Sequence, residues 1–170
     1  MHNLLGGSVT RRRQVAVSGG GASPPEDVLA AAEELGSRLA EAGMVLVCGG
    51  LGGVMEAAAR GAAGAGGEVI GILPGDDPED ANPYCTHVVA TGIGHARNLA
   101  VVASADAVIA IGGEWGTLTE IAFARRLGRP VFAVATWSLR GGGPMEDAPG
   151  IESVSDPAAA VRVVDRATSG

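Results

Sequence analysis

The sequence contains no lysine, and all 12 of its basic residues are arginine. This absence excludes two kinds of site. A pyridoxal-phosphate enzyme needs a lysine ε-amine for its Schiff base, and a Walker phosphate-binding loop needs a lysine beside the phosphates. The chain is therefore expected to bind any phosphate without a lysine.

Cysteine and aromatic residues are also scarce. The two cysteines, Cys48 and Cys85, form neither a Cys-x-x-Cys pair nor a Cys/His cluster at metal-binding spacing, so we expect no metal and a reducing, cytoplasmic setting. No apolar segment has the length of a signal peptide or of a membrane span. Aromatic residues make up only 3% of the chain, so Ala, Val, Leu and Ile have to form the core.

Positive charge is in deficit, with a formal net charge of −7. Nucleic acids and anionic membranes attract proteins through clustered Lys and Arg, so neither is an expected partner. A phosphate that this chain binds should therefore be small and held by a local site.

Short apolar strands alternate with amphipathic helices along the 170 residues, a length that suits one domain. Such strands form a mostly parallel sheet with helices on both faces, which predicts a three-layer, doubly wound, Rossmann-like α/β fold. Residues 13–167 are expected to form this single domain, residues 1–12 a flexible tail and residues 168–170 a frayed end. Strands are predicted at 14–18, 44–48, 68–73, 87–90, 107–111, 131–135 and 151–154. Helices are predicted from 24 to 42, from the turn at 49–53 to about 63, from 94 to 105, from the turn at 112–117 to about 128, and from 156 onward.

Three glycine-rich turns join strands to helices, and right-handed crossovers place all three at the carboxyl edge of the sheet, where ligands of such folds bind. Backbone N–H groups at a helix start favour a phosphate-like anion, although any one of these turns can also be only a permissive bend. The candidate phosphate-binding residues are Gly20 and Gly21 in the first turn, Gly50, Gly52 and Gly53 in the second, and Gly112, Gly113, Gly116 and Thr117 in the third.

The spacing argues against a dinucleotide cofactor, and no other cofactor is expected. From Gly50 the pattern reads Gly50-x-Gly52-x-x-Met55, which lacks the third glycine of the Rossmann fingerprint. The second strand also ends without the acidic residue that binds ribose hydroxyls. A Ser-His-Asp hydrolase is disfavoured because there is no GxSxG turn.

Glu120 follows the third turn, and its role is open between two interpretations. Thr117-Leu118-Thr119-Glu120 fits a capping box, in which Glu120 bonds back to the helix start; alternatively, Glu120 faces a ligand. Arg97 opens the preceding helix at the same edge of the sheet and favours the second interpretation. Arg97 and Glu120 are therefore the candidate catalytic pair.

The segments GGLGGVM at 49–55 and GGEWGTLTE at 112–120 together resemble the LOG-like superfamily, whose members are often mislabelled lysine decarboxylases. Within it, the chain is most similar to a short bacterial branch akin to molybdenum cofactor carrier proteins. The resemblance implies a Rossmann-type homodimer. In its phosphoribohydrolase members, which release a cytokinin base from a nucleoside monophosphate, glycine turns hold the phosphate and an Arg and a Glu serve at the N-glycosidic bond. By position these two residues are Arg97, for phosphate or ribose, and Glu120, for an oxocarbenium-like ribose or a water.

Three departures from the family pattern bear on activity. Ile111 replaces a proline, Asn98 replaces a lysine, and Glu114-Trp115 stands where the hydrolases have one residue. A carboxylate in a phosphate turn repels a dianion unless it points outward, which favours binding over turnover. Three functions stay open: a carrier or sensor of a phosphorylated nucleotide-like molecule (a nucleoside monophosphate or a molybdopterin-type ligand), a nucleoside 5′-monophosphate phosphoribohydrolase, and a structural or signalling dimer with a vestigial pocket.

Overall fold

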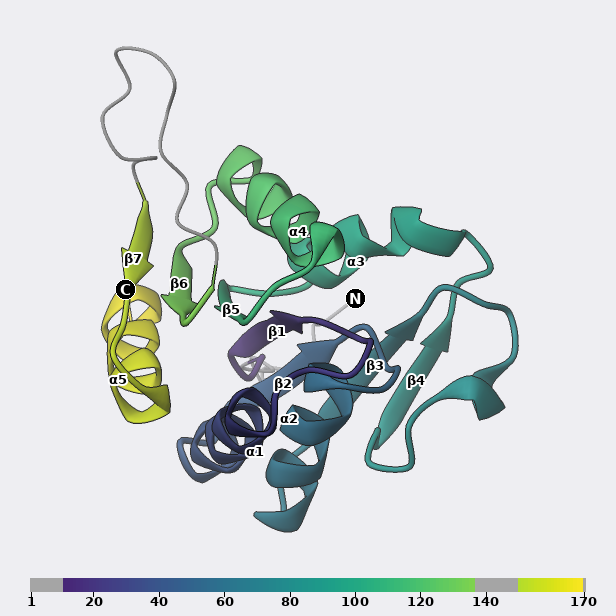
Figure 1. Ribbon diagram of the computed structural model, residues 1–170, viewed down its shortest axis with the longest axis horizontal. Helices are drawn as coiled ribbons and strands as arrows, with labels where there is room; N and C mark the ends of the chain where they lie inside the picture. The colour runs from purple at the N-terminus through teal and green to yellow at the C-terminus, as the bar shows by residue number, and fades with distance from the viewer. Residues whose placement is uncertain (1–10, 137–149, 170) are drawn as a thin grey trace, which may run out of the picture.

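The computed structural model describes residues 11–136 and 150–169, which form a seven-stranded sheet with helices on both faces (Figure 1). The strand order is β4-β3-β2-β1-β5-β6-β7, and every neighbouring pair is parallel. This confirms the three-layer, doubly wound α/β fold. The strands are β1 (Gln14–Gly19), β2 (Val45–Cys48), β3 (Val69–Leu73), β4 (His87–Ala90), β5 (Ala107–Ile111), β6 (Val131–Val134) and β7 (Ile151–Ser153). The helices are α1 (Glu26–Glu41), α2 (Val54–Gly64), α3 (Arg97–Ala103), α4 (Trp115–Arg126) and α5 (Pro157–Thr168), with 3₁₀ turns η1 (Pro78–Asp80) and η2 (Gly94–Ala96).

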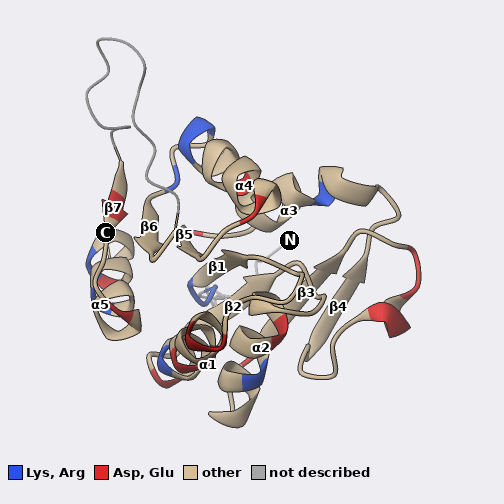
Figure 2. Cartoon of the chain, in the orientation of Figure 1, with Lys and Arg blue, Asp and Glu red and all other residues tan. Residues whose placement is uncertain are grey.

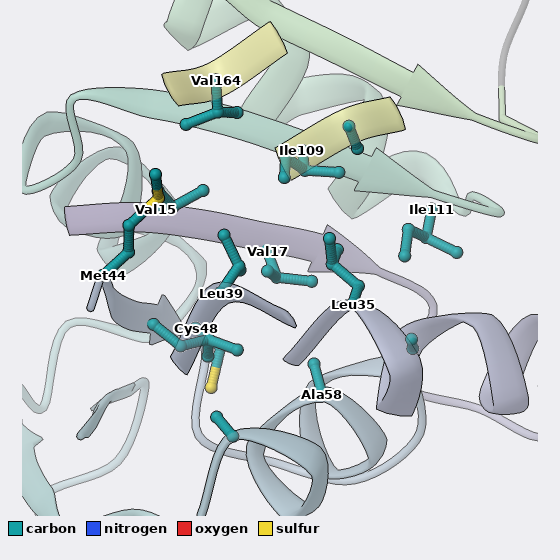
Figure 3. Packing of buried hydrophobic residues seen from close by; sticks show 14 of the residues in the cluster. Val15, Val17, Leu35, Leu39, Met44, Cys48, Ala58, Ile109, Ile111 and Val164 are labelled. Carbon is teal, nitrogen blue, oxygen red and sulfur yellow. The ribbon is translucent and has the colours of Figure 1, made fainter. Parts of the chain in front are cut away.

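Two hydrophobic cores lie on the two faces of the sheet. Successive strand residues point to opposite faces, so Val15 and Val17 of β1 pack under α1, α2 and α5, whereas Ala16 packs under α3 and α4. Figure 3 shows the first core, where Leu35 and Leu39 of α1 lie against β1. The five inner strands are thus largely buried on both faces, as their apolar sequences predict, whereas the edge strands β4 and β7 are partly exposed.

The strand order reverses direction between β1 and β5. From β1 the chain proceeds outward through β2, β3 and β4, then returns to pair β5 on the other side of β1. In doubly wound folds the crossovers diverge at this switch point and leave a crevice at the carboxyl ends of the strands. The first and third glycine turns, which follow β1 and β5, meet there.

The predicted strand boundaries agree with the structure to within about one residue, and the largest difference among the helices lies at the third. The expected helix at 94–105 is instead a 3₁₀ turn at Gly94–Ala96 followed by the seven-residue α3; Gly94 has a φ of +61°, which keeps that residue itself out of an α-helix. Pro25 lies just before the first residue of α1, so that helix starts at Glu26 rather than at residue 24. The sequence also has a run of three glycines at 141–143, which lies outside the described residues.

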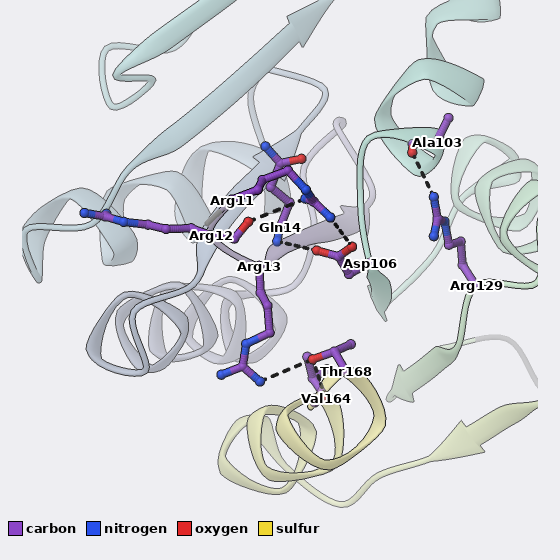
Figure 4. Close-up of polar contacts among 9 residues, drawn as sticks. All are labelled: Arg11, Arg12, Arg13, Gln14, Ala103, Asp106, Arg129, Val164 and Thr168. Atoms are coloured by element: carbon purple, nitrogen blue, oxygen red, sulfur yellow. Dashed lines mark hydrogen bonds and ion pairs between the residues drawn. The ribbon is translucent and has the colours of Figure 1, made fainter. Parts of the chain in front are cut away.

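Arginines near the N-terminus form hydrogen bonds and ion pairs at the amino ends of the strands (Figure 4). Arg11 donates to Asp106 at 2.5 Å, the backbone N–H of Gln14 donates to the same carboxylate at 2.9 Å, and Arg13 donates to Asp165 at 2.6 Å. Partial burial acts to raise the pKa of Asp106, but the hydrogen bonds from Arg11 and Gln14 outweigh it and lower that pKa.

Of the predicted tail, residues 1–10 lie outside the described part of the chain. Thr168 ends α5, and its hydroxyl donates to Val164 O at 2.9 Å.

Helices α1 and α2 approach each other backbone to backbone at two glycines. A Cβ at Gly36 would overlap the carbonyl oxygen of Ala58, and a Cβ at Gly61 would overlap that of Glu33. Only glycine permits this approach, which holds α2 and the turn before it in place. No helix among residues 11–136 and 150–169 is long and apolar enough to cross a membrane.

Replacing Gly36 by Ala should destabilise the protein, although Ala is the better helix former by about 1 kcal/mol. We expect the free energy of unfolding in urea to fall by about 1–3 kcal/mol, because the new methyl group forces the two helices apart. Gly64→Ala is the matched control: Gly64 ends α2, and a Cβ there meets nothing within 4 Å, so stability should stay equal or rise. Similar losses in both variants would contradict the close approach.

Candidate functional site

A cavity of about 170 Å³ lies at the switch point, enclosed by the ends of β1 and β2, the start of α3 and the start of α4. We call it the Arg97–Glu120 pocket. Its polar lining is formed by Ser18, His95, Arg97, Asn98, Glu114, Thr117 and Glu120. The structure thus brings both candidate catalytic residues into one cavity.

Glu120 lies in the second turn of α4, where only 7% of its surface is exposed. Its carboxylate accepts a hydrogen bond from the hydroxyl of Ser18, at the end of β1. Burial raises the pKa of Glu120 to about 7, while the Ser18 hydrogen bond and the charge of Arg97 act in the opposite direction. Near neutral pH this carboxyl group therefore exists in both protonation states.

The capping-box interpretation of Glu120 is wrong. Helix α4 begins at Trp115, two residues before Thr117, and its N-terminus has no side-chain cap. The Glu120 carboxylate pairs with Ser18 on the sheet instead of bonding back to Thr117. Glu120 therefore faces the cavity.

Arg97 is the first residue of α3, and its side chain is folded into the pocket with 8% of its surface exposed. Its Nη1 donates to the side-chain oxygen of Asn98, and a Cβ at Gly49 would lie 2.6 Å from its Nη2. Burial lowers the pKa of the guanidinium, which the nearby Glu120 partly offsets. A cation and a titratable carboxyl group thus share one enclosed space.

Two buried polar atoms of the pocket have no hydrogen-bond partner among the described residues: Nε of Arg97 and Oγ1 of Thr117, a residue 2% exposed. Buried donors are nearly always paired, and an unpaired one costs about 1–3 kcal/mol. The other two such atoms, in Arg129 and Thr136, do not line this pocket. Both atoms belong to residues that line the Arg97–Glu120 pocket.

The predicted phosphate-binding glycines divide into three groups. Gly21 and Gly116 line the Arg97–Glu120 pocket together with Thr117. Gly20, Gly112 and Gly113 line an adjoining cavity of about 150 Å³ beside the first turn. The remaining three, Gly50, Gly52 and Gly53, line neither cavity.

The second turn supports the first. Gly53, with φ +66°, packs on the backbone of Gly20, and Val54 N–H donates to Gly20 O at 3.0 Å. Asn82 stabilises the second turn as well, because its backbone N–H donates a hydrogen bond to Gly50 O at 2.8 Å. Ligand contact by Gly50, Gly52 and Gly53 stays a prediction.

Sequence reasoning missed Ser18 and Asn98 as site residues. Ser18 is a single hydroxyl at the end of an apolar strand directly before a glycine turn, which is a usable signal in a doubly wound fold. Asn98 gave no such signal, because its role comes from the bend of Arg97 back onto it.

Another hollow of the described surface lies away from this pocket. A more open hollow of about 710 Å³, lined by Arg125, Phe132, Glu152 and others, lies by the amino ends of β6 and β7, away from the glycine turns. No group of three His, Cys, Asp or Glu residues suited to a metal ion occurs in the part of the chain that the structure describes. Figure 2 shows arginines scattered over several elements rather than gathered on one face.

The pKa of Glu120 predicts a pH-dependent stability. The folded protein keeps a proton on this carboxyl up to about pH 7, whereas a glutamate in the unfolded chain has an ordinary pKa of 4.5. The stabilising contribution is therefore complete below about pH 4.5 and is lost as the pH rises through 7. In urea denaturation, the stability of wild type relative to Glu120→Gln should fall by up to about 3 kcal/mol over that window. Glu79→Gln, an exposed control, should follow wild type. Parallel curves for wild type and Glu120→Gln would contradict the burial of an ionisable group.

Comparison with known proteins places this geometry in a family. The model of the SLOG cluster4 family matches residues 12–162. The chain is 31% identical to the molybdenum cofactor binding protein of the phototrophic bacterium Rippkaea orientalis, with a TM-score of 0.82, over 92% of this chain and 97% of that one. It is 32% identical to the molybdenum cofactor carrier protein MCP of Chlamydomonas reinhardtii, also with a TM-score of 0.82, over 94% of this chain and 100% of that one.

Among curated proteins, the probable cytokinin riboside 5′-monophosphate phosphoribohydrolase LOGL5 of Oryza sativa subsp. japonica is 38% identical over 94 residues, or 54% of this chain. The two curated matches cover 66% and 38% of those relatives' own lengths. The family match spans most of the chain, and the fold agrees along nearly its whole length. The chain therefore belongs to the SLOG cluster4 family, within the LOG-like and molybdenum-cofactor-carrier-like superfamily.

Proposed function

We propose that the Arg97–Glu120 pocket binds a small phosphorylated molecule of the nucleotide type. The observation that carries this proposal is the pair of unpaired buried donors, Arg97 Nε and Thr117 Oγ1. An anionic oxygen accepts hydrogen bonds from both, and hydrogen bonds to charged groups are about twice as strong as neutral ones. Binding would thus give both donors the hydrogen-bond partners that they lack in the free protein.

The start of α4 adds to the attraction for an anion. Gly116 and Thr117 lie in its first turn and line the pocket, where backbone N–H groups are free of intrahelical partners and the helix dipole is positive. With Arg97 opposite, this supports a phosphate located between α3 and α4.

The relatives fit such a ligand. Two solved relatives bind the molybdenum cofactor, and the rice relative is named for a nucleoside 5′-monophosphate. A nucleoside monophosphate or a molybdopterin-type molecule is therefore the ligand class proposed for this chain. The expected homodimer and cytoplasmic location belong to the same proposal.

Thr117→Val should separate binding from stability. The substitution keeps the shape and removes only the hydroxyl, so we expect adenosine or guanosine monophosphate to bind at least about tenfold more weakly in calorimetry. The unliganded variant should be at least as stable as wild type, because an unpaired buried hydroxyl is lost. Thr119→Val is the control: this hydroxyl lies on the exposed side of the same helix and donates to Trp115 O. Equal affinities of wild type and Thr117→Val would contradict the proposed position of the phosphate.

A second candidate function is hydrolysis of the N-glycosidic bond of a nucleoside 5′-monophosphate. The observation that favours it is Glu120, whose pKa of about 7 suits a general acid or base at neutral pH. In its ionised form Glu120 would take a proton from a water that attacks the anomeric carbon. The C–N bond would break with its electron pair going to the departing base, to which Glu120 returns the proton taken from the water, while Arg97 holds the phosphate or ribose.

Chromatography of free base after incubation with nucleoside monophosphates tests this second function. If the chain is a hydrolase, base should be released by wild type and by Glu79→Gln, but at least about a hundredfold more slowly by Glu120→Gln, since general acid–base catalysis contributes about 10²–10⁴-fold. Saturable binding of the monophosphate without any base release would contradict turnover and leave the binding function. Absence of both binding and release would leave the structural or signalling role with a vestigial pocket.

A further inference from the structure

Glu114 belongs to the third glycine turn, but its side chain contacts the first. It directly precedes α4 and makes no side-chain cap for that helix. Its Oε1 instead accepts a hydrogen bond from the backbone N–H of Ala22 at 3.3 Å. The carboxylate therefore points across the switch point into the first turn, not outward.

The carboxylate lies directly over the backbone of Gly20. A Cβ on Gly20 would be 2.9 Å from Glu114 Oε1, so the absence of a side chain there makes room for the carboxylate. Backbone N–H groups of a glycine turn before a helix are the groups expected to hold a ligand's phosphate. In this structure the anion at the first turn is the protein's own.

Glu114 also lies between two cavities at the candidate site. It lines both the Arg97–Glu120 pocket of about 170 Å³ and the adjoining cavity of about 150 Å³ beside the first turn. Each cavity alone is below the roughly 300 Å³ at which small-molecule sites begin. Both the charge and the position of this side chain therefore limit what the site can accept.

We propose that Glu114 is a tethered anion that sets the charge preference of the site. It holds the anion position of the first glycine turn, and a phosphorylated ligand gains that position only by displacing it. Displacement is feasible because Glu114 is exposed and its bond to Ala22 is long. This proposal rests on the proposed binding of a phosphorylated molecule and names the residue that limits its affinity.

Two substitutions at Glu114 test the proposal by calorimetry with adenosine monophosphate and with adenosine. Glu114→Gln removes the charge but keeps an acceptor for Ala22 N–H; Glu114→Ala removes both and joins the two cavities. Adenosine monophosphate should bind about tenfold more tightly to Glu114→Ala and several-fold more tightly to Glu114→Gln, because the repulsion between carboxylate and phosphate is lost. The affinity of Glu114→Gln for adenosine should change less than about twofold, because this variant keeps the shape of the side chain. Glu79→Gln, which lines neither cavity, should bind both molecules as wild type does.

The outcomes are distinguishable. If the monophosphate binds wild type and both Glu114 variants equally, Glu114 does not hold the anion position, and the proposed function stands without it. An equal gain for adenosine and its monophosphate would show a steric role and overturn the role of charge. If none of the proteins binds the monophosphate, the proposed function fails and this inference fails with it. As a control for folding, the thermal unfolding midpoint of each variant is compared with that of wild type.

Discussion

The pairing of β1 with β5 is the contact on which the site depends. Its register places Ser18 beside Ala110 and Gly19 beside Ile111, so the turns after these two strands leave the sheet side by side. The hydroxyl of Ser18 can then reach Glu120 on the helix that follows the third turn, and Glu114 can reach the first turn. A shift of this register would separate residues that are about a hundred positions apart in the chain.

Buried charge without full hydrogen bonding is what distinguishes this pocket from the cores around it. Arg97 and Glu120 are desolvated together, and the pKa of the carboxyl rises because burial outweighs the attraction between them. The unpaired atoms of Arg97 and Thr117 cost stability in the free protein. Natural folds usually retain such unfavourable buried groups at functional sites, and we therefore interpret the unpaired atoms of this pocket as part of a ligand site.

The fold and part of the site follow from the sequence because they depend on local patterns. Apolar strands and glycine turns fixed the order of elements, and the position of Arg97 and Glu120 next to those turns brought them to the same edge. What failed depended on tertiary geometry. The 3₁₀ turn before Arg97 shortens α3, and the start of α4 at Trp115 excludes the capping box; neither is visible in a residue pattern. The direction of the Glu114 side chain depends on the neighbouring turn, which lies far away in the sequence.

The central claim is that the Arg97–Glu120 pocket is a phosphate site of a SLOG cluster4 protein, with Arg97 and Thr117 as its unpaired donors. A crystal structure of the protein with adenosine monophosphate tests this most directly. The account predicts phosphate oxygens within hydrogen-bond distance of Arg97 Nε and Thr117 Oγ1, at the start of α4. A nucleotide bound elsewhere, such as in the hollow by β6 and β7, with both donors still unpaired, would contradict it.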